Sequence, residues 1–276
     1  LLDSAPILHL VTRPFQDKEE RQLAESQVSL KFEKVFASIS GHPLVSNLSF
    51  EVLTGETLVL LGKSGSGKTS ALKLINGLLM PDRGKVLVEG TPTTEWDPIR
   101  LRRGIGYVIQ EVGLFPHLTI ERNVALVPRL EGWETERTRA RVVELLEMVG
   151  LEPEKFARRH PHELSGGQRQ RIGVARALAA DPPLLLMDEP FGALDPVTRV
   201  EIQREFSGLQ ERLGKTVVFV THDVREAFQL GSRIGLMDGG TLVELAEPAD
   251  FLSSEDRNAR EFLEILNLPV SKSSPA

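Results

Sequence analysis

The sequence of 276 residues contains no cysteine, only one tyrosine and only two tryptophans. The absence of cysteine excludes disulfide bonds and thiolate metal sites, and it fits a protein of the cytoplasm. No apolar run approaches the roughly 18 residues that a membrane-spanning helix requires, so we expect no transmembrane segment. Leu1 to Phe15 also lacks the basic opening of a secretory signal and carries Asp3, His9 and Arg13.

The formal net charge is −6. General nucleic-acid-binding proteins gain affinity by neutralising phosphates, so this charge argues against nucleic acid as a partner. The length and the hydrophobic content of 41% allow one large core. They favour a single α/β domain with an inserted subdomain over two independent domains.

Residues 62–69 read GKSGSGKT, which is the spacing of a phosphate-binding loop. The apolar run 57–61 predicts a buried strand before the loop, and Leu72 and Ile75, three apart, predict a helix after it. The glycines let backbone N–H groups surround phosphate oxygens, and the helix dipole favours an anion. Lys68 would reach the β and γ phosphates, and the Thr69 hydroxyl would bind Mg²⁺. The predicted phosphate-binding residues are Gly62, Lys63, Ser64, Gly65, Ser66, Gly67, Lys68, Thr69 and Ser70.

Two further apolar runs are followed by polar residues suited to phosphate chemistry. Run 184–187 is followed by Asp188 and Glu189, and run 217–220 is followed by a threonine and His222. Because ligands of open α/β sheets bind at the carboxyl ends of the strands, we expect these residues to lie beside the phosphate loop. Asp188 would then bind Mg²⁺ and Glu189 a water molecule. Taken alone, each pattern is better explained by a turn, a cap or a solvated residue at a strand end, and it is their combination that favours the phosphate site.

A second potential anion site consists of Ser165, Gly166 and Gly167, which precede the helical stretch 168–180. A hydroxyl group and bare backbone amides at a helix N-terminus favour an anion, although the same residues would also serve as a simple loop and N-cap. Two anion sites far apart in one chain suggest two surfaces that meet at one nucleotide.

Together these motifs resemble those of ABC ATPases, over roughly residues 28–248. The Ser-Gly-Gly-Gln sequence separates this family from kinases, GTPases and other phosphate-loop proteins. The segments that resemble the family's Walker A, Q-loop, signature, Walker B, D-loop and H-loop are, in this order, 62–69, Gln110, Leu164 to Gln168, Leu184 to Glu189, Ala193 to Asp195, and His222. The resemblance implies an α/β P-loop NTPase fold, with a RecA-like core around a parallel sheet, an antiparallel β subdomain and an inserted α-helical subdomain.

The resemblance also implies ATP and Mg²⁺ as cofactors, with Gln110 joining Thr69 and Asp188 at the metal. Glu189 would polarise the attacking water, and His222 would steady the water and the γ-phosphate. Hydrolysis of this kind depends on positioning and charge stabilisation rather than on a covalent nucleophile. The predicted catalytic residues are Lys68, Gln110, Glu189 and His222.

The same resemblance implies a homodimer or a pair of ATPase subunits. ATP bound at the phosphate loop of one chain would be covered by Ser165, Gly166, Gly167 and Gln168 of the other. Asp195 would signal across the dimer.

Adenine usually stacks on an aromatic residue in this family, and two residues here compete for that position. The spacing favours Ile39, whereas Phe36 is the only aromatic residue nearby. Phe36 fits the core as well, since Leu30, Phe32 and Val35 are also apolar in a strand-like stretch.

Asp188 follows Lys68 by 120 positions (188 − 68), more than one crossover needs, so we place the helical subdomain at about 97–167. Asp97 followed by Pro98 has the pattern of a helix start. The remaining predicted units are an extension at 1–27, and a C-terminal helix with a disordered tail at 249–276.

The segment after the Q-loop glutamine resembles that of importer ATPases. Leu114, Phe115 and Leu118 suit a groove for a short helix of a membrane permease, although ordinary packing explains each of them as well. The stretch 111–133 resembles the ATPases of bacterial importers for osmoprotectants such as glycine betaine, choline or carnitine.

We therefore expect an ATP-hydrolysing subunit at the cytoplasmic face of the cell membrane, which drives solute uptake through a permease and has a solute-binding protein as an indirect partner. An importer ATPase for an amino acid or a sulfonate would share nearly all of these motifs. A soluble ABC ATPase would be expected to show long insertions, tandem halves or a basic surface. A module that holds ATP without turnover would not need both Glu189 and His222.

Overall fold

The computed structural model describes residues 27–110, 112–192 and 194–265. Nearly all of the expected N-terminal extension lies outside the described residues, as do Glu111, Ala193 of the D-loop and the tail at 266–276. No helix in the described ranges is long and apolar enough to span a bilayer.

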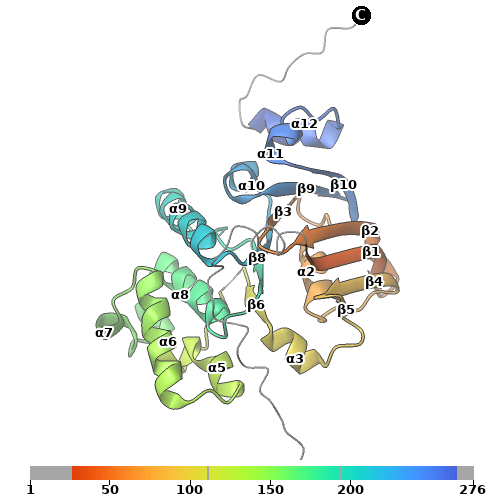
Figure 1. Cartoon of the computed structure of the whole chain (residues 1–276). Coiled ribbons are helices and arrows are strands. Elements are labelled where there is room, and N and C mark those ends of the chain that lie inside the picture. The colour runs from red at the N-terminus through yellow and green to blue at the C-terminus, as the bar shows by residue number, and fades with distance from the viewer. Residues whose placement is uncertain (1–26, 111, 193, 266–276) are drawn as a thin grey trace, which may run out of the picture.

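A six-stranded sheet forms the centre of the molecule (Figure 1). Its strands are ordered β10 (Thr241–Ala246), β9 (Arg233–Asp238), β3 (Thr57–Leu61), β8 (Thr216–Thr221), β7 (Leu184–Asp188) and β6 (Ile105–Val108). Neighbouring strands are parallel, except that β10 runs antiparallel to β9. The three apolar runs of the sequence are thus confirmed as adjacent parallel strands, and their carboxyl ends meet at one edge of the sheet.

Both faces of this sheet are buried, which explains why its strands are apolar throughout rather than alternating. Leu58 and Leu60 of β3 pack on the face covered by α2 (Lys68–Ile75). Val59 and Leu61 pack on the opposite face, which is covered by α8 (Gly166–Leu178), α9 (Pro196–Leu213) and α10 (Val224–Leu230). Full burial of each such side chain contributes about 1.5–3 kcal/mol relative to exposure.

A second, antiparallel sheet packs beyond α2. Its strands are ordered β2 (His42–Leu53), β1 (Val28–Ile39), β4 (Arg83–Val88) and β5 (Thr91–Pro92). Phe32 of β1 and Phe50 of β2 stack with their ring centroids 4.5 Å apart. This sheet confirms the expected antiparallel β subdomain.

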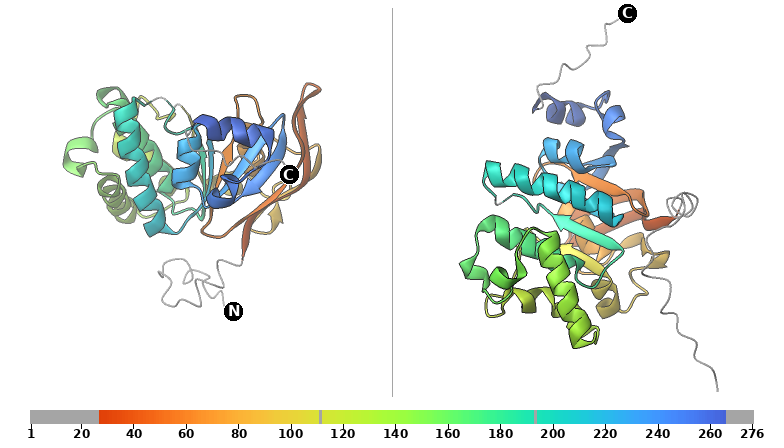
Figure 2. Two further views of the ribbon diagram at one scale, coloured as in Figure 1. Left: turned by 90° about the horizontal axis from the view of Figure 1, so that it is seen from above. Right: turned by 60° about the vertical axis from the view of Figure 1, so that its left-hand side comes forward.

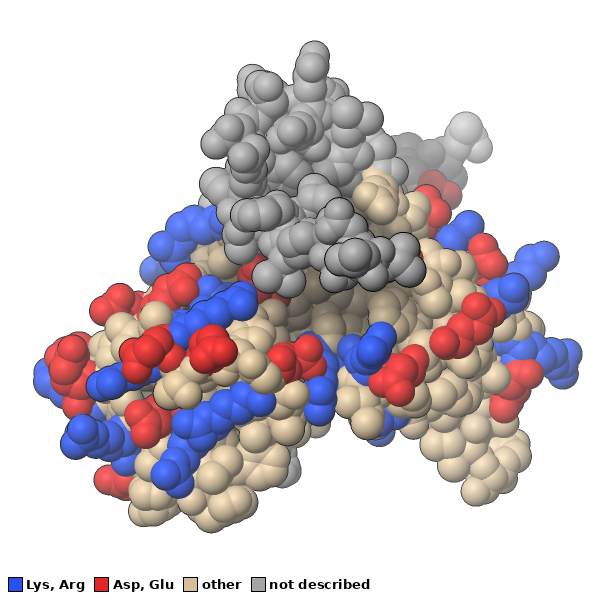
Figure 3. Space-filling view, turned by 60° about the horizontal axis from the view of Figure 1, so that its bottom comes forward, with Lys and Arg blue, Asp and Glu red and all other residues tan. Residues whose placement is uncertain are grey.

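The helices within residues 120–163 gather in a lobe on the other side of the central sheet (Figures 1 and 2). They are α4 (Ile120–Val124), α5 (Leu126–Leu130), α6 (Thr135–Met148), α7 (Pro153–Phe156) and a short 3₁₀ helix, η1 (Pro161–Glu163). On the face seen in Figure 3, positive and negative side chains are interspersed, as is typical of solvated helix faces.

The expected insertion at 97–167 contains more than this lobe. Asp97 caps α3 (Pro98–Arg103) by accepting a hydrogen bond of 2.8 Å from the Arg100 amide, as the sequence predicted. The next element, β6, pairs with β7 and therefore belongs to the central sheet. Residues 98–108 thus lead back into the core, and the helical lobe begins after them.

The C-terminal part contains two helices where the sequence analysis expects one, α11 (Pro248–Phe251) and α12 (Arg257–Ile265). They are separated because the Asp256 carboxylate accepts hydrogen bonds from the amides of Asn258 and Ala259, which starts a new helix. The side chains of Phe262 and Leu263 in α12 are buried against the core.

The turn that follows the Q-loop is organised by the fully buried Asn123 of α4. Its amide oxygen accepts a hydrogen bond of 2.8 Å from the Phe115 N–H, and its amide nitrogen donates to the carbonyl groups of Phe115, Leu118 and Thr119 at 3.0–3.2 Å. A single side chain therefore fixes the backbone that presents Phe115.

We predict that Asn123→Ala lowers the free energy of unfolding by about 2–3 kcal/mol, because it leaves buried backbone groups without partners. Urea denaturation of the purified chain measures the change. Arg122→Ala, an exposed position of the same helix, is the control and should shift stability by less than about 0.5 kcal/mol. Equal stabilities of the two variants would contradict this role of Asn123.

Candidate nucleotide-binding site

The phosphate loop runs from the end of β3 to the start of α2. Gly67 adopts φ +98°, and a Cβ atom at this position would lie 2.7 Å from the Leu44 carbonyl oxygen, so no larger residue fits. As the N-cap of α2, Gly67 provides no side chain to cap the helix. The first N–H groups of α2 therefore have no side-chain cap and can bind an anion at the positive end of the helix.

Lys68 supplies a buried cation beside these amides. Its side chain is folded back over the loop, where Nζ donates hydrogen bonds of 2.8 Å to the carbonyl oxygens of Gly62 and Lys63. Burial lowers the pKa of Lys68, while the charges of Glu189 and Asp188 act in the opposite direction. The ammonium group now donates to two neutral carbonyl oxygens. The charged oxygens of a bound phosphate would be stronger acceptors for the same hydrogen bonds.

Asp188 and Thr69 meet at the end of β7. Thr69 Oγ1 donates to Asp188 Oδ1 at 2.9 Å, and the Tyr107 hydroxyl lies 3.4 Å from Asp188 Oδ2. Burial raises the pKa of Asp188. A carboxylate in such a position is costly to ionise without a nearby cation. Together with the hydroxyl of Thr69 it provides the hard oxygen ligands that Mg²⁺ prefers, so the two residues fit such an ion.

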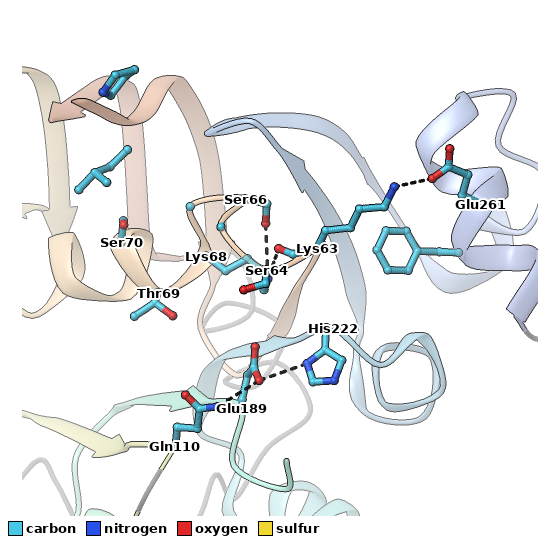
Figure 4. A pocket seen from close by; sticks show the side chains of 15 residues that line it. Lys63, Ser64, Ser66, Lys68, Thr69, Ser70, Gln110, Glu189, His222 and Glu261 are labelled. Atoms are coloured by element: carbon cyan, nitrogen blue, oxygen red, sulfur yellow. Dashed lines mark hydrogen bonds and ion pairs between the residues drawn. The ribbon is translucent and has the colours of Figure 1, made fainter. Parts of the chain in front are cut away.

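Glu189, His222 and Gln110 converge from three different loops (Figure 4). Glu189 Oε2 lies 3.1 Å from His222 Nδ1 and accepts a hydrogen bond of 3.4 Å from Gln110 Nε2. Glu189 has φ +43°, a conformation that residues other than glycine seldom adopt, and its N–H donates to the Val220 carbonyl of β8 at 3.0 Å. This unusual backbone directs the carboxylate toward the cavity rather than along the strand.

These groups surround one cavity of about 860 Å³. Of the residues expected from the sequence, the structure brings together around it Lys63, Ser64, Gly65, Ser66, Gly67, Lys68, Thr69, Ser70, Gln110, Glu189 and His222. Gly62 and Asp188 do not line the cavity themselves. They accept hydrogen bonds from Lys68 and Thr69, which do.

Five residues at the site were missed by the sequence analysis. Pro43 and Leu44 of β2 and Glu261 and Phe262 of α12 also line the cavity. Tyr107 supports Asp188 from β6. Glu261 also forms an ion pair of 2.5 Å with Lys63, between two exposed side chains (Figure 4).

Neither of the two candidates for adenine lines the cavity. Phe36 is half-buried on β1, where the Arg83 guanidinium lies 5.5 Å from its ring centroid. Ile39 is 55% exposed at the end of the same strand. The hairpin that carries them contributes Pro43 and Leu44 to the cavity instead.

The second predicted anion site lies on a different surface. Ser165 caps α8 in a capping box with Gln168, with hydrogen bonds of 3.0 and 3.3 Å, and neither residue lines the cavity. A Cβ atom at Gly167 would lie 2.6 Å from the Thr198 side chain, so α8 begins in close contact with α9. Asp195 caps α9 there by accepting a hydrogen bond of 3.0 Å from the Thr198 N–H. Gly167 of the signature and Asp195 thus both contact Thr198, and neither lines the cavity at the phosphate loop of the same chain.

Comparison with known proteins places this site in a family. Residues 45–192 match the ABC transporter family. The chain is 51% identical to the osmoprotectant import ATP-binding protein OsmV of Salmonella typhimurium, over 83% of this chain and 60% of that protein. It is 49% identical to the choline transport ATP-binding protein OpuBA of Bacillus subtilis, over 85% and 61%. It is 44% identical to the glycine betaine uptake system ATP-binding protein YehX of Escherichia coli, over 85% and 75%.

The chain thus spans about three fifths of the length of OsmV and OpuBA. Among solved structures, it is similar to the ATP-binding cassette MJ0796 in a dimeric, post-hydrolysis state bound to ADP and Pi, with a TM-score of 0.71 and 36% identity over 79% of this chain and 98% of that one. CbiO1 of Clostridium perfringens gives a TM-score of 0.76 and 26% identity over 88% and 96%. Sequence, fold and site geometry agree, and the chain belongs to the ABC transporter family.

Proposed function

We propose that this chain binds ATP with Mg²⁺ and hydrolyses it, as the energy-supplying subunit of a solute importer. The observation that carries the proposal is the convergence on one cavity of Lys68, the pair of Thr69 and Asp188, and the pair of Glu189 and His222. A cation, a metal-binding pair and a carboxylate beside an imidazole are the groups that γ-phosphate hydrolysis requires.

Each residue then has a distinct task. Lys68 and the amides of the loop would bind the phosphates. Thr69 and Asp188, with Gln110 lining the same cavity, would hold Mg²⁺, which would neutralise phosphate charge. The Glu189 carboxylate orients water and accepts its proton, and His222, in contact with that carboxylate, steadies the same water. The reaction needs no covalent intermediate on the protein.

We propose further that two ATPase subunits close around the nucleotide, with Ser165, Gly166 and Gly167 of one facing the phosphate loop of the other. Support comes from the separation of the two anion sites within one chain. Two apolar residues near the start of α9, Val197 and Val200, are 70% and 45% exposed beside the signature residues. A second subunit docked at this surface would remove both side chains from water, which favours association.

The transported solute would be a quaternary amine, in keeping with the names of the relatives described above. The chain would lie at the cytoplasmic face of the membrane, bound to a permease near Leu114, Phe115 and Leu118. Phe115 is 41% exposed, whereas the other two are half-buried, so Phe115 is the residue that a partner helix would contact most. The Asn123 hydrogen bonds hold it in a defined position.

We predict that Phe115→Asp abolishes binding to the permease and leaves the affinity for ATP unchanged, because a buried charge without a partner is costly at an interface. Co-purification with the permease and nucleotide titration measure the two properties. Leu252→Asp is a matched control, since Leu252 is also 41% exposed. Retention of the permease by the Phe115 variant would show that the partner docks elsewhere.

The proposed function as a whole is tested by affinity capture. The Glu189→Gln variant, loaded with ATP, is mixed with detergent-solubilised membranes of the source organism, and the retained proteins are identified by mass spectrometry. Recovery of a multi-span permease that binds quaternary amines supports the importer. Recovery of soluble proteins alone would move the chain to the class of non-transport ABC ATPases.

A further inference from the structure

The carboxyl group of Glu226 is buried close to the site but has no part in the reaction described above. Glu226 lies in the first turn of α10 and is only 4% exposed. It accepts a hydrogen bond of 2.5 Å from Thr221 Oγ1 and one of 2.8 Å from Gln203 Nε2. Burial raises its pKa, and the hydrogen bond from Thr221 acts in the opposite direction. A buried carboxyl group with two side-chain donors fixes the elements that carry those donors.

One of these elements carries His222. Thr221 is the last residue of β8, and its hydroxyl group also accepts a hydrogen bond of 2.9 Å from the Asp223 N–H. The backbone on both sides of His222 is therefore held by the Thr221 hydroxyl, which Glu226 in turn orients. The His222 side chain itself is 60% exposed and contacts Glu189. Packing does not hold such an exposed ring, so its position depends on the backbone beneath it and on its contact with Glu189.

The other element is α9, through a row of polar residues spaced four apart. Asp195, Arg199 and Gln203 follow this spacing, which places them on one side of the helix. Arg199 donates hydrogen bonds of 3.2 Å to the carbonyl oxygens of Phe191 and Leu194, and so ties α9 to these two residues, which lie between Glu189 and Asp195 in the sequence. Gln203, one turn later, binds Glu226.

We propose that Glu226 is a positioning residue for His222, and that it couples His222 to the loop before Asp195 through Gln203 and Arg199 of α9. The inference deepens the proposed function and depends on it for its consequence. If a second ATPase subunit docks at the surface around Asp195, Val197 and Val200, a shift of α9 on docking moves Gln203 and Glu226. The backbone of His222 would move with them. Hydrolysis would then respond to closure of the dimer without any direct contact between the partner subunit and His222.

Kinetics separate this role from a merely structural one. Glu226→Ala is expected to lower kcat for ATP by on the order of 10- to 100-fold, as misplaced catalytic groups do, with an unchanged Kd for ATP. Glu226→Gln keeps an acceptor for one of the two donors and should retain more activity. In a His222→Ala background, Glu226→Ala should change kcat by less than about twofold, because the residue acts through His222. Weakened ATP binding, or a full additional loss in the double variant, would overturn the proposal.

A second readout does not require turnover. The imidazole resonances of His222, observed by NMR in the nucleotide-free chain, should shift or broaden in Glu226→Ala and in Gln203→Leu, which cuts only the link to α9. The exposed Glu201→Ala on the same helix is the control and should leave them unchanged. Unchanged His222 resonances in both variants would refute the positioning role. Altered resonances in a chain that does not hydrolyse ATP would uphold the positioning role and refute the proposed function instead.

Discussion

Glu189→Gln is expected to bind ATP as tightly as the native chain and to lower kcat by about 10²–10⁴-fold, the range that a general base contributes. The amide is isosteric with the carboxylate, so the cavity keeps its shape, but it cannot accept a proton from water. It also replaces the charged acceptor that His222 and Gln110 approach at 3.1 and 3.4 Å. The backbone of Glu189, tied to Val220, should be unaffected.

Two measurements test this expectation. Phosphate release under saturating ATP gives kcat, and titration with ATP gives the Kd. Glu95→Gln, an exposed glutamate in the turn after β5, makes the same chemical change outside the cavity and should leave both quantities unchanged. A Glu189 variant that still hydrolyses ATP at the native rate would remove Glu189 from the mechanism, whatever its position in the structure.

Lys68→Ala is expected to raise the Kd for ATP at least about 100-fold. The Lys68 ammonium group now donates to two backbone carbonyl oxygens, and phosphate oxygens would replace these by charge-assisted hydrogen bonds, each worth about 1.5–3 kcal/mol. Its burial means that water cannot compensate for the lost cation. The fold should persist, because the loop is bounded by β3 and α2, which are held by apolar packing.

Equilibrium binding of a fluorescent ATP analogue, with circular dichroism to check the fold, measures this effect. Lys85→Ala removes an exposed lysine of β4 and serves as the control, with an expected change in Kd of less than about twofold. ATP binding of native affinity by a folded Lys68 variant would mean that the nucleotide binds outside the phosphate loop.

The site could be predicted from the sequence where local pattern and topology act together. Strands β3, β7 and β8 are buried on both faces and therefore appear as continuous apolar runs, which are easily found. Once they are placed in one parallel sheet, the convergence of Thr69, Asp188 and His222 follows, since the carboxyl ends of parallel strands share an edge. For this reason the contact between Thr69 and Asp188, which are 119 residues apart, can be predicted from the sequence.

Other features could not be predicted because they depend on long-range packing. Glu261 reaches Lys63 across 198 residues only because α12 docks on the core, and no local pattern signals that contact. Strand β6 has four residues, too few for a reliable period, so the sequence alone does not separate it from the helical insertion. The division between α11 and α12 did have a signal, since Asp256 follows Ser253 and Ser254 and is a typical N-cap residue.

Phe36 illustrates a third kind of difficulty. An aromatic residue in a strand next to the phosphate loop fits both a base-stacking role and a core position, and its pattern does not distinguish them. In the structure its ring is half-buried beside Arg83 and does not line the cavity, while Pro43 and Leu44 do. These two residues were not predicted because proline and leucine carry no distinctive signal for a nucleotide base. The contact of adenine with Phe36 or Ile39 stays a prediction.

The central claim is that the cavity between the phosphate loop, Asp188 and Glu189 hydrolyses ATP with Mg²⁺. The most direct test is the rate of phosphate release from ATP by the purified chain, with Mg²⁺ and after its removal by a chelator, as protein concentration is increased. We predict turnover that requires Mg²⁺ and rises more steeply than in proportion to the concentration of the chain, because two subunits must meet. Binding of ATP without any phosphate release, at every concentration and with Mg²⁺ present, would contradict the account.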